Sequence, residues 1–96
     1  MRIVLIGSGG VATSLAAALA SHAPASLCGI YSRQQAHAES LRERFALACP
    51  VTDSLQQLPA ADLYIIAVSD HAIAEVAKAL PPLDGLVVHT LSLIHI

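Results

Sequence analysis

The sequence predicts an α/β fold, in which helices cover both faces of a doubly wound parallel sheet. Two observations predict it: short runs of β-branched residues and Leu alternate with helical patterns, and the connections between them are short. Strands that alternate with helices in this way form parallel sheets with right-handed crossovers. We therefore expect three layers, α/β/α, and a sheet with the strand order 3-2-1-4-5.

The first third of the chain holds a strand, a helix and a second strand. Arg2–Ile6 is expected to be a strand that is covered on both faces, because β-branched residues and Leu follow each other without interruption after Arg2. In the helix that follows, helical spacing predicts an inward face made of Val11, Leu15, Ala18, Leu19 and His22. Pro24 ends this helix, and Leu27–Tyr31 is the second expected strand.

The middle of the chain predicts a helix and two weaker elements. Gln34–Phe45 is expected to be a helix with a polar outer face, and its inward residues are Ala38, Leu41 and Phe45. Ala46–Val51 is expected to form a short, weak strand. Asp53–Leu58 is expected to form a helical turn that begins with Thr52 or Asp53 as its cap.

The last part of the chain predicts a strand, a helix and a final strand. Asp62–Val68 is the clearest strand of all, because six apolar residues follow each other within it. Ala72–Leu80 is expected to be a helix that Pro81-Pro82 ends, and Leu86–His89 is the fifth strand. A doubly wound sheet normally continues beyond this point, so we expect the chain to be the front part of a longer protein.

A glycine-rich segment lies between the first strand and the first helix and has the pattern GxGxxA: Gly7-Ser8-Gly9-Gly10-Val11-Ala12. Gly7 permits a tight turn out of the strand, Gly9 lets a pyrophosphate approach the backbone, and Ala12 lets the helix pack closely on the strand. The helix N-terminus offers N–H groups and the positive end of its dipole to phosphates. The segment predicts a Rossmann-type dinucleotide site; the alternative is a glycine-rich turn without a ligand.

Several motifs in order resemble one family. They are the GxGxVA loop, the strand end Tyr31-Ser32-Arg33, the strand end Ala67-Val68-Ser69-Asp70 with Ala72-Ile73 after it, and Val87-Val88-His89-Thr90. Together they resemble the N-terminal Rossmann domain of the pyrroline-5-carboxylate reductase-like group. The resemblance implies that residues 1–90 form an NAD(P)-binding domain. It also implies a full-length homodimer that is joined through a further C-terminal domain.

The chain departs from this family at two points. Gly10 stands where relatives often carry Asn, which loosens the turn but leaves the phosphate argument intact. After Thr90, where relatives continue with Ser-Gly, residues 91–96 look like a tail that is not native to the protein. We therefore give His95 no functional weight, and we expect the 96 residues alone to be marginally stable, prone to aggregation and inactive.

The end of the second strand indicates the choice of cofactor. An NAD site places a carboxylate there, on the ribose hydroxyls, but Tyr31-Ser32-Arg33 contains none and Glu39 lies well inside the next helix. Ser32 and Arg33 are instead suited to a 2′-phosphate, one as a hydroxyl donor and the other as a planar cation. The sequence predicts NADP(H) rather than NAD(H), and the alternative is an arginine that points to solvent.

Three residues after the fourth strand are further candidates. Val68, Ser69 and Asp70 lie where ligands of open α/β sheets bind, and the family resemblance places their backbone under the nicotinamide-side ribose. Ser69 or Asp70 is equally suited to cap the next helix, and the two roles are compatible. His71 is expected to be an exposed residue of the first helical turn.

The sequence identifies no complete catalytic constellation. His89 ends the fifth strand at the same sheet edge and is the one candidate for orienting a substrate or transferring a proton. A structural, hydrogen-bonded histidine is the alternative. His22 and His37 have no partner nearby in sequence, no metal-binding spacing occurs, and Cys28 and Cys49 are expected in the core.

Composition excludes several classes of protein. The chain is 55% hydrophobic and 12% charged with a net charge of −2, which disfavours disorder. The five Lys and Arg residues are scattered along the sequence and form no basic cluster of the kind that binds nucleic acid, so we expect no nucleic-acid partner. The glycine loop interrupts the first apolar run, and no run is long enough to span a membrane. We expect a cytoplasmic protein.

Two functions from different classes follow from these observations. The first is the NADP(H)-binding domain of an oxidoreductase that acts on an unknown small-molecule substrate. The second is a dinucleotide-binding or sensing module without redox catalysis, because fold and glycine loop indicate binding only.

Overall fold

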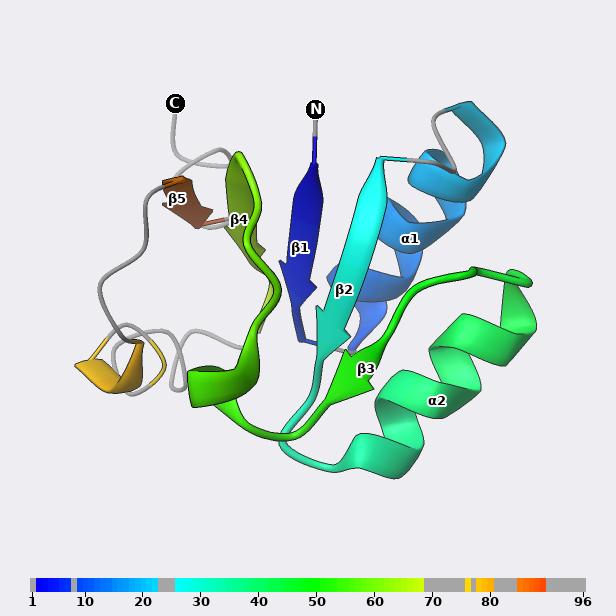
Figure 1. Ribbon diagram of the computed structural model, residues 1–96. Coiled ribbons are helices and arrows are strands. Elements are labelled where there is room, and N and C mark those ends of the chain that lie inside the picture. Colours follow the sequence, from blue (N-terminus) through cyan, green and yellow to red (C-terminus); the bar gives the residue numbers. More distant parts are fainter. Residues whose placement is uncertain are drawn as a thin grey trace.

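The protein forms a five-stranded parallel sheet (Figure 1). The computed structural model describes residues 2–7, 9–22, 26–68, 76, 78–80 and 85–89. The strands are β1 (Ile3–Ile6), β2 (Leu27–Tyr31), β3 (Val51–Thr52), β4 (Leu63–Ile66) and β5 (Leu86–His89). Their order, β3-β2-β1-β4-β5, confirms the predicted topology.

The register of the sheet brings the strand ends together. Ile6, the last residue of β1, pairs with Tyr31 of β2 on one side and Ile66 of β4 on the other. Ile66 in turn pairs with His89 of β5. Because all strands are parallel, the loops that follow these residues lie on one edge of the sheet, where ligands of open α/β sheets bind.

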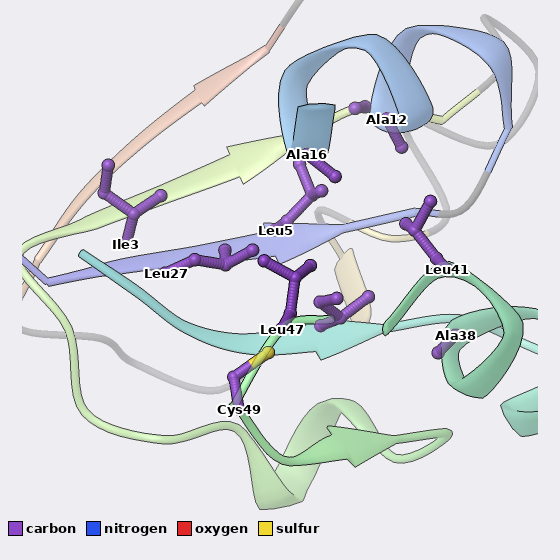
Figure 2. Packing of buried hydrophobic residues seen from close by; sticks show 11 residues of the cluster. Ile3, Leu5, Ala12, Ala16, Leu27, Ala38, Leu41, Leu47 and Cys49 are labelled. Atoms are coloured by element: carbon purple, nitrogen blue, oxygen red, sulfur yellow. The ribbon is translucent and has the colours of Figure 1, made fainter. Parts of the chain in front are cut away.

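Two hydrophobic clusters cover the two faces of the sheet. On one face, α1 (Gly10–His22) and α2 (Gln35–Arg44) pack against β1 and β2. Figure 2 shows Ala16 of α1 beside Leu5 of β1, with Leu41 of α2 in the same cluster. On the other face, Val4 and Ile6 pack with residues of β4 and with Val76. The interior of the sheet is therefore shielded from water on both sides, as its continuous apolar strands predict.

The inward face of α1 differs from the predicted one. Ala12 and Ala16 are fully buried, whereas Val11 is 48% exposed and Ala18 and His22 are also exposed. Leu15 and Leu19 do pack against the core, but they are only partly buried. Since α1 is apolar around most of its circumference, spacing alone does not define its inner face. The small residues face the sheet because they allow the helix axis to lie close to β1.

The segment between α2 and β4 also departs from expectation. Helix α2 confirms the predicted inward residues Ala38 and Leu41, with Phe45 partly buried beside them. The predicted strand Ala46–Val51 is wrong for most of its length, because only Val51 and Thr52 form β3. Ala46 adopts a positive φ of 53°, and its N–H donates to the carbonyl oxygen of Glu43 at 3.2 Å. The chain therefore makes a turn at Ala46 after α2, where an extended strand was expected.

Two smaller boundaries are corrected as well. A 3₁₀ turn, η1 (Leu55–Gln57), occupies the predicted helical turn, but its cap is Ser54 rather than Thr52 or Asp53. The Ser54 side chain accepts a hydrogen bond from the backbone N–H of Gln56 at 3.3 Å. Strand β4 is shorter than Asp62–Val68. Most of the predicted helix at 72–80 and all of the segment 91–96 lie outside the described residues.

Candidate functional site

A cavity of about 650 Å³ lies at the edge of the sheet where β1, β2 and β4 end. Its size is that of a small-molecule or cofactor site. Three segments form most of its wall: the loop from β1 to α1, the residues from the end of β2 to the first turn of α2, and the end of β4. The cavity is therefore built by parts of the chain that are distant in sequence and that the sheet register brings together.

Gly7 follows β1 directly and is close to the ends of both neighbouring strands, β2 and β4. Its N–H donates to the carbonyl oxygen of Tyr31 at 2.7 Å, and its φ of 129° lies in the region that favours glycine. A Cβ at this position would lie against the carbonyl group of Ala67, 2.9 Å from the carbonyl carbon. Conformation and close packing therefore both require glycine here.

Gly9 and Gly10 have the opposite environment. Among the described residues, a Cβ built on either glycine would meet no atom within 4 Å, and both glycines line the cavity. The N–H and the hydroxyl of Thr13 each donate to the carbonyl oxygen of Gly9 at 2.8 Å, which fixes the loop onto the first turn of α1. The space that the missing side chains leave fits a pyrophosphate at the N-terminus of α1.

The remaining residues of the GxGxxA segment take different positions. Val11 also lines the cavity, which accounts for the exposure of this large apolar side chain. Ala12, which belongs to α1, is fully buried in the core cluster between this helix and the sheet. It does not line the cavity, and its burial agrees with its expected packing role. Ser8 lies outside the described residues.

Ser32 and Arg33 follow β2 and also line the cavity. Ser32 is only 4% exposed; its N–H donates to the carbonyl oxygen of Thr52, and its hydroxyl oxygen accepts from the N–H of Gln34 at 3.3 Å. Arg33 is exposed. Ser32 thus shapes the turn into α2, and Arg33 contributes the positive charge at this end of the cavity.

The third part of the wall comes from the end of β4 and from segments around it. Ala67 and Val68 line the cavity, and the N–H of Ala67 donates to the carbonyl oxygen of Ile6 at 2.8 Å. Leu55 of η1 also lines the cavity. The candidates Ser69 and Asp70, and also His71, lie outside the described residues.

The described wall of the cavity carries the positive charge of Arg33 and no negative charge. It contains Arg33 and His37, and no carboxylate occurs among the described residues that line it. Neither α1 nor α2 has an acidic residue in its first turn. An anionic ligand would meet no like charge from these residues.

The other candidates are placed as follows. His89 forms the end of β5, at the same sheet edge, and its side chain is outside what the structure describes. Cys49 is buried and Cys28 partly buried, and burial raises the pKa of the Cys49 thiol. Within the described part of the chain, no three potential metal ligands cluster and no helix has the length and hydrophobicity to cross a bilayer.

Sequence reasoning missed several residues of the cavity wall. They are Tyr31, Gln34, His37, Leu55, Ala67, Val76 and Ala79. Leu55 and Ala79 belong to neighbouring segments, because the side-chain amide of Gln56 donates to the carbonyl oxygen of Ala79 at 3.0 Å. Leu55 could have been found from its position in the sequence. It follows the third strand by a few residues, and the carboxyl end of that strand lies at the sheet edge that forms the cavity.

Comparisons with known proteins agree with this geometry. The model of a family described as "NADP oxidoreductase coenzyme F420-dependent" matches residues 2–91. A structure from Bacteroides fragilis, of a protein assigned as an NADP oxidoreductase, superposes with a TM-score of 0.77 and 32% identity, over 92% of this chain and 35% of that one. No curated protein sequence matches significantly.

Two further structures are similar. A conserved hypothetical protein from Sinorhizobium meliloti has a TM-score of 0.73 and 25% identity, over 93% of this chain and 32% of its own. Arogenate dehydrogenase from Synechocystis has a TM-score of 0.72 and 23% identity, over 93% and 32%, and shows likeness of fold alone. The chain therefore spans about a third of the length of these proteins.

Proposed function

Because the chain belongs to the family of NADP oxidoreductases described as coenzyme F420-dependent, we propose that its cavity binds NADP(H) as the cofactor of a redox reaction. The observation that carries the proposal is the pair of glycines at the start of α1. Gly9 and Gly10 leave open space where a side chain would stand, beside backbone N–H groups that a helix N-terminus presents to phosphates.

Each part of the cavity has a role in this proposal. The first turn of α1 holds the pyrophosphate, and Val11 packs against the dinucleotide from the same side. Leu55, Val76 and Ala79 offer an apolar wall that suits an adenine ring. Val68, with Ser69 and Asp70 after it, is assigned to the ribose on the nicotinamide side. The bound cofactor supplies a hydride or accepts one.

The preference for NADP(H) over NAD(H) is part of the proposal. The segment after β2 provides Arg33 at the cavity and no carboxylate for the ribose hydroxyls. A guanidinium binds a phosphate through charge-assisted and often bidentate hydrogen bonds. Buried Ser32 holds the turn from which Arg33 projects. The finer assignment, to the pyrroline-5-carboxylate reductase-like group with residues 1–90 as its cofactor domain, stays a prediction, as does a role for His89.

Competition between the two cofactors tests this proposal on the protein and its Arg33→Ala variant. The protein is expected to prefer NADP(H) by roughly 10- to 100-fold, because a hydrogen bond to a charged group contributes about 1.5–3 kcal/mol. The preference should grow at low salt. The variant should lose most of it and keep its affinity for NAD(H).

Arg42→Ala is the matched control, because Arg42 lies in the last turn of α2 and does not line the cavity. Its ratio of NADP(H) to NAD(H) affinity should equal that of the unchanged protein. A ratio that Arg33→Ala leaves unchanged would show that Arg33 points to solvent, and the choice of NADP(H) would then be wrong.

A further inference from the structure

The apolar end of the cavity is built by two segments that are distant in sequence. Leu55 belongs to η1, whereas Val76 and Ala79 belong to helical residues that come after β4. Both segments lie on the same face of the sheet, where Leu55 and Leu80 pack against the cluster that contains Val76. Figure 1 shows η1 in green beside these helical residues in yellow. The spacing between the two segments therefore sets the width of this end of the cavity.

A hydrogen bond joins the two segments directly. The side-chain amide of Gln56 donates to the carbonyl oxygen of Ala79 at 3.0 Å, although the two residues are 23 positions apart in sequence. The backbone of Gln56 is held at the same time, because its N–H donates to the hydroxyl oxygen of Ser54 at 3.3 Å. Gln56 is exposed and does not line the cavity. Its side chain therefore connects the two segments from outside the space that a ligand would occupy.

The accepting carbonyl group lies where a helix needs donors from other parts of the chain. Ala79 is at the end of the helical residues, because Leu80 is no longer helical and Pro81 and Pro82 follow it in the sequence. Carbonyl groups in the last turn of a helix have no intrahelical partner, and proline has no N–H to offer them. Gln56 supplies a donor at this position. The bond thus satisfies the end of one segment with a side chain of the other.

We propose that Gln56 is a positioning residue for the adenine end of the dinucleotide: its hydrogen bond to Ala79 holds the two segments at the spacing that admits the base. This inference rests on the proposed function, which assigns Leu55, Val76 and Ala79 to the adenine ring. Without the bond, the segments would sample wider spacings, and a smaller fraction of the molecules would have the spacing that binds. The apparent affinity falls in proportion to that fraction.

The effect should be confined to ligands that contain the base. The buried residues of α1 pack on the opposite face of the sheet from Leu55 of η1, so a wider adenine end leaves the phosphate site at the start of α1 in place. ADP contains both the base and a pyrophosphate, whereas inorganic pyrophosphate contains the phosphates alone. A change in the ratio of their affinities therefore reports on the adenine end, and a general loss of structure would weaken both ligands alike.

The test measures the dissociation constant of NADP⁺ by titration calorimetry, and those of ADP and inorganic pyrophosphate by their displacement of NADP⁺. Gln56→Ala should weaken the binding of NADP⁺ and ADP about three- to tenfold, the range that one net hydrogen bond contributes, and leave pyrophosphate unchanged. Gln56→Glu keeps the shape but has no donor, so it should weaken both at least as much. Gln56→Lys restores a donor at a helix C-terminus and should recover the ratio of ADP to pyrophosphate affinity.

Gln57→Ala and Gln57→Lys are the matched controls, because Gln57 is the next residue of η1, is also exposed and does not line the cavity. Neither should change the ratio of ADP to pyrophosphate affinity, and Gln57→Lys accounts for the added charge. If Gln56→Ala binds ADP as tightly as Gln57→Ala does, or weakens pyrophosphate as much as ADP, only the role of Gln56 is overturned. If the unchanged protein does not bind NADP⁺, the proposed function fails, and this inference fails with it.

Discussion

Replacement of Gly7 by alanine is expected to destabilise the fold by about 2–6 kcal/mol. Two costs add: a non-glycine residue in a sparsely populated backbone region costs about 1–3 kcal/mol, and overpacking a close-packed interior costs a similar amount. Gly7 has a φ of 129°, and its added Cβ would press on the carbonyl group of Ala67. Backbone cannot move aside as the end of a flexible side chain can.

The measurement is the free energy of unfolding from denaturant titration, with Gly10→Ala as the control. Gly10 begins α1, and a Cβ there would meet no atom within 4 Å in the part of the chain that the structure describes. Alanine should therefore be neutral or stabilising at Gly10, by up to about 1 kcal/mol, because it has the higher helix propensity. Equal destabilisation by the two substitutions would contradict the steric explanation. Since whole domains are stable by only about 5–15 kcal/mol, the Gly7 variant should lose a large share of its folded population.

The sheet could be predicted from sequence because its determinants are local. Four of the five strands are apolar runs with clear ends, and the handedness of crossovers leaves few topologies for such an alternation. The third strand was misplaced because its two residues, Val51 and Thr52, are defined by pairing with Ile30 and Tyr31 rather than by their own pattern. That pairing is a tertiary contact, so the local sequence did not contain it.

The same distinction applies to helix α1. Its existence followed from the glycine loop and Pro24, but its inner face did not follow from spacing. Alanines and leucines occur on several sides of the helix, so the inner face depends on how closely the helix can approach the sheet. The burial of Ala12 followed from a steric argument about close packing, and that argument was right where the periodicity was wrong.

The cavity was predictable in part for a related reason. The glycine loop and the end of β2 could be identified because each carries its own local signal. His37, Leu55 and Val76 reach the same cavity from helical segments whose sequences contain no binding motif. Only the arrangement of α2, η1 and the segment after β4 around one sheet edge reveals them.

Substitution of Gly9 by valine is expected to weaken dinucleotide binding by at least roughly a hundredfold while the fold persists. A branched side chain would fill the open space beside the first turn of α1 and displace the pyrophosphate from the backbone N–H groups. Loss of two hydrogen bonds to a charged group, at about 1.5–3 kcal/mol each, corresponds to roughly a hundredfold or more. A Cβ at Gly9 would meet no atom of the described residues within 4 Å, so valine does not press on the described interior. The expected cost in stability is about 1 kcal/mol, from a poorer residue before the helix.

Titration calorimetry with NADP⁺ and denaturant unfolding, both on the same variant, separate these two effects. Ser14→Val is the matched control, because it places the same side chain on an exposed position of α1 that does not line the cavity. It should leave the affinity unchanged, since only a side chain within the cavity competes with the phosphates. Gly9→Ala should fall between the two, because its single methyl group fills less of the same space. If Gly9→Val binds NADP⁺ as tightly as the unchanged protein, the pyrophosphate does not lie at the start of α1, and the glycine loop is then a structural turn.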